Sequence, residues 1–103
     1  MTIATYSVTT SIGNAYISGG NTAITSLTLC NFGSNEVTAN LYVVPNTATP
    51  DTVNIALSNV AIASGDTLQM YIAAEKLLLG PGDSIRVNAN AATLTAVTSY
   101  TSI

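Results

Sequence analysis

Apolar and polar residues alternate position by position along several short stretches of this chain. A period of two is the pattern of a β-strand with one buried face. In the clearest stretch, 36–44, the positions on one side are aliphatic: Val37, Ala39, Leu41 and Val43. Positions 67–72 and 83–89 repeat the pattern. Tyr42 and Tyr71 lie out of phase with the aliphatic positions of their stretches, and we expect both to face outward.

Turn-forming residues separate these stretches, and they set the number of strands. Gly, Asn, Asp, Ser and Pro gather at 18–21, 31–35, 45–51, 64–66 and 80–83. The candidate strands between them are 3–8, 14–17, 24–31, 36–44, 52–57, 60–62, 67–72, 76–79, 83–89 and 93–102. A strand roughly every 8–12 residues is typical of a β-sandwich. We therefore expect residues 1–103 to form a single all-β domain, a β-sandwich or small jelly roll of about eight short antiparallel strands. Helix is limited to at most one turn at 73–76.

Three of the turns share a local sequence in which Gly is followed by Asn or Asp and then by a hydroxyl residue. They begin at Gly20, Gly65 and Gly82. Gly adopts positive φ without steric cost, and an Asn or Asp side chain can cap a turn. We expect each of these glycines to reverse the chain into the strand that follows.

The phase of the last candidate strand, 93–102, is ambiguous. Leu94 and Val97 are separated by an odd number of positions. They fall on opposite faces of a regular strand, and on the same face only if a β-bulge intervenes. The sequence leaves both alternatives open.

Charged residues make up only 7% of the chain, against about 25% in an ordinary soluble domain. The two basic residues are Lys76 and Arg86, the net charge is −3, and there is no His. Two cations cannot form the basic surface that neutralises phosphates, so we expect no binding to nucleic acid.

The side chains of common catalytic and metal sites are also sparse. Without His, Cys30 has no ordinary partner to activate it as a nucleophile, and we expect it to act as a small, buried or half-buried apolar residue. Asp51, Asp66 and Asp83 could be calcium ligands, but each stands alone in sequence and turn capping is favoured. The Gly-rich stretch at 80–84 lacks the spacing of a phosphate loop. We expect no catalytic residue, no metal and no cofactor.

No stretch reads as a signal peptide or a membrane span, because the longest apolar runs are short, as at 77–79. We expect a soluble protein without membrane contact. A single Cys cannot form an intrachain disulfide, which favours assembly in a reducing cytoplasm.

Two protein faces rich in Thr, Ser and Asn repel each other only weakly. Removing water from such faces also costs less free energy than removing it from charged ones. Exposed sheet edges with few Lys residues also favour pairing. The chain is therefore predicted to form a homo-oligomer or to join a larger lattice. Loops 45–51 and 73–76 are the predicted contact sites.

Five segments of the chain form a recognisable set: 24–31 (ITSLTLCN), 37–45 (VTANLYVVP), 64–68 (SGDTL), 79–87 (LGPGDSIRV) and 96–103 (AVTSYTSI). In this order they resemble small virion structural proteins of tailed bacteriophages, in particular those of cyanobacterial and other marine phages. The resemblance implies a β-sandwich component of the particle, without enzymatic activity, assembled in the cytoplasm of the bacterial host.

Within that class the compact chain fits a capsid decoration (cement) protein, which stabilises the head by binding the major capsid protein. A neck, tail or fibre component that binds other virion proteins is an alternative. A second alternative is a glycan-binding module, in which an exposed Tyr42 would lie beside hydrogen-bonding groups such as Asn40.

Overall fold

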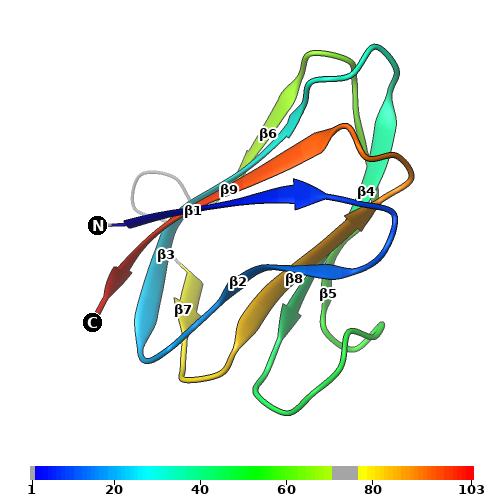
Figure 1. Ribbon diagram of the computed structural model, residues 1–103. Coiled ribbons are helices and arrows are strands. Elements are labelled where there is room, and N and C mark those ends of the chain that lie inside the picture. The colour runs from blue at the N-terminus through cyan, green and yellow to red at the C-terminus, as the bar shows by residue number, and fades with distance from the viewer. Residues whose placement is uncertain (1, 71–76) are drawn as a thin grey trace.

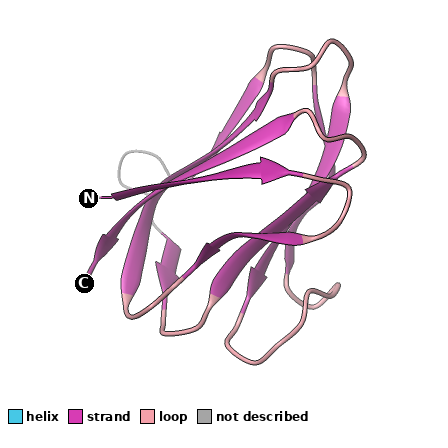
Figure 2. Ribbon diagram, in the orientation of Figure 1, coloured by secondary structure: helices cyan, strands magenta, loops and turns pink. Residues whose placement is uncertain are grey.

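The computed structural model describes residues 2–70 and 77–103, and in that part of the chain two antiparallel sheets pack against each other without any helix (Figures 1 and 2). Sheet A consists, in order across the sheet, of β1 (Thr2–Val8), β9 (Leu94–Ser102), β3 (Thr22–Asn31) and β6 (Thr67–Met70), with β7 (Leu77–Leu79) also paired to β3. Sheet B consists of β2 (Gly13–Ile17), β8 (Ser84–Ala89), β4 (Val37–Val44) and β5 (Ile55–Ile62). The predicted all-β sandwich is confirmed. The predicted helical turn at 73–76 lies outside the described residues.

Strands β6 and β7 share one edge of sheet A. β6 pairs with residues 27–30 of β3, and β7 pairs with residues 22–24 of the same strand. Each sheet therefore has four strand positions. Eight positions in two sheets are what a jelly roll contains, and that variant of the sandwich stays a prediction.

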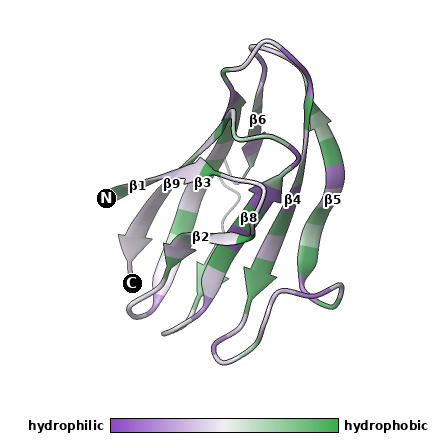
Figure 3. Cartoon of the chain, turned by 45° about the vertical axis from the view of Figure 1, so that its right-hand side comes forward, coloured by the Kyte–Doolittle hydropathy of each residue, from purple (hydrophilic) through white to green (hydrophobic). Residues whose placement is uncertain are grey.

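Alternate residues of both sheets form the core between them, and Figure 3 shows the alternating hydropathy along the strands. The largest aliphatic side chains with no exposed surface come from four strands: Ile24, Leu27, Leu29, Leu41, Ile85 and Leu94. Burying one such side chain contributes about 1.5–3 kcal/mol. In β4, Val37, Ala39 and Leu41 are buried as the alternation predicts.

The prediction of two separate strands at 52–57 and 60–62 is wrong. Residues 55–62 form one strand, β5, with a register shift against β4 and a left-handed residue, Asn59, at φ 50°. Residues 52–54 belong to a turn, in which the Asn54 amide donates to the Asp51 carbonyl at 3.1 Å. The break that the sequence suggested between two strands is therefore an irregularity within one strand.

The ambiguity in the last strand is settled by regular pairing along β9. Leu94 and Ala96 are buried, whereas Val97 is half exposed and lies on the opposite face. The extra residue is in β3 instead, because the register between β3 and β9 shifts between Ile24 and Ser26. This bulge lets Ile24 and Leu27 both point into the core although an odd number of positions separates them.

Two of the three repeated glycine turns have the expected geometry, with φ of +76° at Gly65 and +82° at Gly82. Gly20 also lies where the chain reverses, between β2 and β3, but its φ is not positive. Side-chain hydroxyls close that turn instead. Ser18 Oγ and Thr22 Oγ1 lie 2.9 Å apart, and both are within hydrogen-bonding distance of the Gly20 carbonyl.

Asn31, the last residue of β3, joins three separate segments through a fully buried side chain. Its Nδ2 donates to the carbonyls of Asn35, at 2.8 Å, and Ile62, at 2.9 Å. Its Oδ1 accepts from the Gly33 amide, at 3.0 Å, and from the Thr93 hydroxyl, at 3.2 Å. These four bonds use the full capacity of a side-chain amide and tie β3, β5 and the start of β9 together.

Candidate interaction surfaces

The outer face of sheet A carries no charged side chain in the strands that the structure describes. Its residues alternate with the buried ones, and the pairing aligns them in rows across four strands. Two complete rows are Ser7, Thr95, Cys30, Thr67 and Thr5, Val97, Thr28, Gln69. We call these eight residues the sheet A face. It is an uncharged surface made mostly of hydroxyls, with one thiol, one aliphatic side chain and the amide of Gln69.

β1 begins and β9 ends at the same end of sheet A (Figure 1). The register places exposed aliphatic residues at this end. Ile3, Leu78 and Ile103 are 65%, 66% and 68% exposed. Ile103 is held there by a 3.0 Å hydrogen bond from its amide to the carbonyl of Asn21. The uncharged surface of sheet A therefore continues into an apolar end.

The loop between β4 and β5 is longer than the predicted contact loop at 45–51, and its own hydrogen bonds order it. Asn54 donates through Nδ2 to the Thr49 carbonyl at 2.9 Å and accepts from the Asp51 amide at 3.0 Å. Val53 is 88% exposed at this turn. Sequence reasoning missed Val53, because it assigned 52–57 to a strand. The other predicted contact loop, 73–76, lies outside the described residues.

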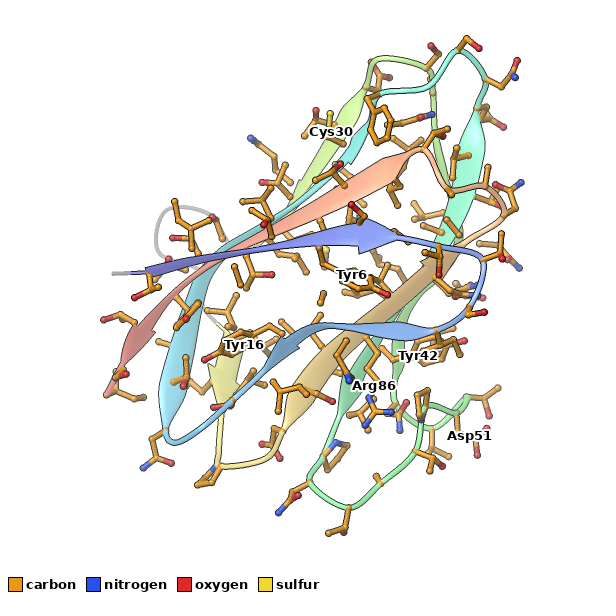
Figure 4. All side chains as sticks on the ribbon, viewed as in Figure 1. Tyr6, Tyr16, Cys30, Tyr42, Asp51 and Arg86 are labelled. Carbon is orange, nitrogen blue, oxygen red and sulfur yellow. The ribbon has the colours of Figure 1, made fainter. Side chains whose placement is uncertain are left out.

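The outer face of sheet B is polar and includes the two residues singled out for glycan contact. The register places Asn40 of β4 opposite Asn88 of β8, and Tyr42 opposite Arg86. Asn14 of β2 lies opposite Arg86 on its other side. We call these five residues the sheet B face. Figure 4 shows Tyr42 and Arg86 on neighbouring strands, apart from Tyr6 and Tyr16.

Arg86 is the one basic residue of the part of the chain that the structure describes, and it is half-buried. Its Nε donates to Ser84 Oγ at 3.1 Å. Within residues 2–70 and 77–103, no further hydrogen bond of its guanidinium group is present. The two Nη groups are therefore available for a ligand.

The three aspartates considered as calcium ligands occupy separate turns. Asp83 accepts from the amides of Gly80 and Asn46, each at 2.8 Å, and Asp51 accepts from the Thr52 amide at 2.7 Å. Both cap turns as predicted. Asp66 contributes to its turn through the backbone. Among the described residues there is no group of three His, Cys, Asp or Glu side chains that could hold a metal ion.

The remaining tyrosines of the described chain pack inward. Tyr6, Tyr16 and Tyr100 lie against the core, and the rings of Tyr16 and Tyr100 are tilted by 37° with centroids 4.4 Å apart. Cys30 is half-buried in the sheet A face. Tyr71, predicted to face outward, lies outside the described residues.

Both candidate surfaces are shallow, since no pocket occurs in the described part of the chain. That part also contains no helix with the length and apolar character needed to span a membrane. Comparisons with models of protein families, with curated proteins and with solved structures give no match.

Proposed function

We propose that this protein is a non-enzymatic structural subunit of a bacteriophage particle, and specifically a capsid decoration protein. The observation that carries the proposal is the sheet A face, a broad strand surface without any charge. The centres of protein interfaces are depleted of charged residues, because burying an unpaired charge costs far more than burying a hydroxyl that finds a hydrogen bond. The resemblance of several segments to phage virion proteins, noted in the sequence, is the reason for proposing a phage particle as the assembly.

In this role the sheet A face packs against the major capsid protein or a second copy of the chain. The exposed aliphatic side chains at the end of sheet A extend that contact. Val53, on the ordered loop between β4 and β5, offers a second contact on a neighbouring subunit. A protein that touches two subunits at once stabilises the shell by linking them. Assembly takes place in the host cytoplasm, and the finished protein belongs to the virion.

The first test is the copy number of the protein in purified particles, measured by quantitative mass spectrometry against the major capsid protein. A copy number comparable to that of the capsid protein supports decoration of the head. A few to a few tens of copies would move the protein to the neck, tail or fibres. Its absence from intact particles would refute the virion assignment.

The second test places a charge in the sheet A face. Thr28 lies on the central strand β3 and is half exposed, so Thr28→Lys should fold normally. Buried in an interface, the new ammonium would lack a partner, and we expect co-sedimentation with particles that lack the protein to weaken by at least about tenfold. Asn88→Lys, on the sheet B face, is the matched control and should bind as the parent does. Equal binding by both variants would show that the sheet A face is not the contact.

A further inference from the structure

The sheet B face has a donor arrangement that attachment through sheet A does not use. The orientation of its side-chain amides follows from one backbone group. The Asn59 amide donates to the side chain of Asn40 at 2.8 Å, so the atom that it meets must be Oδ1. The Nδ2 of Asn40 then faces Asn88, and the atom that accepts from it at 3.3 Å is Oδ1 of Asn88.

This chain of assignments leaves N–H donors free. Asn88 keeps both hydrogens of its Nδ2, and Asn40 keeps one. Arg86 lies two residues before Asn88 on the same face of β8, with its Nη groups free of hydrogen bonds to the described residues. The result is a row of donors along β8 with one positive charge at the Ser84 end, in a protein whose net charge is −3.

Tyr42 completes the arrangement, because it lies directly opposite Arg86 in the antiparallel pair. The Cβ atoms of such a pair are about 4.5–5.5 Å apart, so the two side chains leave the sheet side by side. The ring is half exposed. It offers an apolar surface and a hydroxyl beside the row of donors.

We infer that the sheet B face binds an acidic saccharide, meaning a chain of sugars in which a uronic-acid type of residue carries a carboxylate. The carboxylate accepts two hydrogen bonds from the Arg86 fork. Sugar hydroxyls accept from the amides of Asn88 and Asn40, and the apolar face of a sugar ring lies on Tyr42. A single guanidinium group pairs with one carboxylate, so a sugar that carries one carboxylate per residue and several hydroxyls matches a row of donors with only one charge better than a polyanionic peptide does. A shallow surface suits an extended chain. The inference does not depend on the assignment to a phage particle.

The test is titration of the full chain with trigalacturonic acid at low ionic strength. Binding is monitored through the NMR chemical shifts of the backbone amides. Shifts confined to β4 and β8, and at least tenfold weaker binding of neutral trigalactose, are the expected results. Arg86→Lys keeps the charge but loses the fork, and we expect its affinity to fall about tenfold or more. Gln69→Ala, on the sheet A face, is the control and should bind as the parent does.

Asn88→Asp tests the row of donors without disturbing the fold. An Asp at this position still accepts from Asn40, but it replaces two free donors with a negative charge. We expect at least tenfold weaker binding with an unchanged thermal midpoint. The absence of shifts at millimolar trigalacturonate, or parent-like affinity in Arg86→Lys and Asn88→Asp, would overturn the inference. Tighter binding of a glutamate-containing peptide than of the saccharide would overturn it in favour of a protein partner.

Discussion

The buried amide of Asn31 gives the sharpest test of what holds this sandwich together. Asn31→Ala removes four hydrogen bonds that join the ends of β3 and β5 to the start of β9. At a net of about 0.5–1.5 kcal/mol for each bond, the loss is about 4 kcal/mol. The buried Ile62 carbonyl also loses a partner. Since a domain of this size is stable by only about 5–15 kcal/mol, the substitution should remove a large part of its stability.

Urea titration followed by far-UV circular dichroism measures this loss directly. The free energy of unfolding in water should fall by about 4 kcal/mol with the slope unchanged, and the thermal midpoint should fall by roughly 15 °C or more. Asn35→Ala is the matched control, because Asn35 is exposed and takes part only through its backbone carbonyl. It should change stability by less than about 0.5 kcal/mol.

Asn31→Asp separates hydrogen bonding from shape. The carboxylate has nearly the shape of the amide but cannot donate to the carbonyls of Asn35 and Ile62. At pH 7 this variant should be destabilised at least as much as Asn31→Ala. A loss below about 1 kcal/mol in both variants would refute the argument that the amide links the three segments.

Three further substitutions follow from single contacts, and thermal unfolding measures each. Thr98→Val should raise stability by about 1 kcal/mol, because Thr98 Oγ1 is buried without a partner in the described structure; a loss of stability would contradict this. Gly82→Ala should cost about 1–2 kcal/mol, since its φ is positive and a Cβ would lie 2.5 Å from the Asn46 side chain. The control Gly19→Ala meets no atom within 4 Å and should be neutral, so equal effects would exclude the steric reason. Asp83→Ala removes two accepted hydrogen bonds and should cost about 1 kcal/mol, a prediction that an unchanged midpoint would contradict.

The sheets were predictable from sequence because a period of two along a strand is a local property. In 36–44 it identified the buried side of β4 and placed Tyr42 outward. It failed at β5, where a left-handed Asn59 interrupts the alternation without ending the strand. The alternation could not show whether 93–102 contains a bulge, because the bulge in this pair of strands lies in the partner strand β3.

The candidate surfaces depend on pairings between distant parts of the chain, and for that reason the sequence predicted only fragments of them. It singled out Tyr42 and Asn40 as neighbours on one strand. That Arg86 and Asn88 lie opposite them follows from the register of β4 with β8. Likewise, the turn at 31–35 was expected, but the partners of Asn31 at Ile62 and Thr93 are 31 and 62 residues away. No local pattern reveals such contacts.

The place of β9 in sheet A governs when the protein can fold. This strand, the last of the nine in the described part of the chain, lies between β1 and β3 and is paired to both, so that Thr2 meets Tyr100 and Thr22 meets Ser102. On the ribosome, β1 and β3 emerge early but have no strand between them until residue 102 has been made. Closing such long loops before any pairing stabilises them makes folding slow, on the order of milliseconds to seconds. Until then, the uncharged strands of sheet A remain open to pairing with other nascent chains.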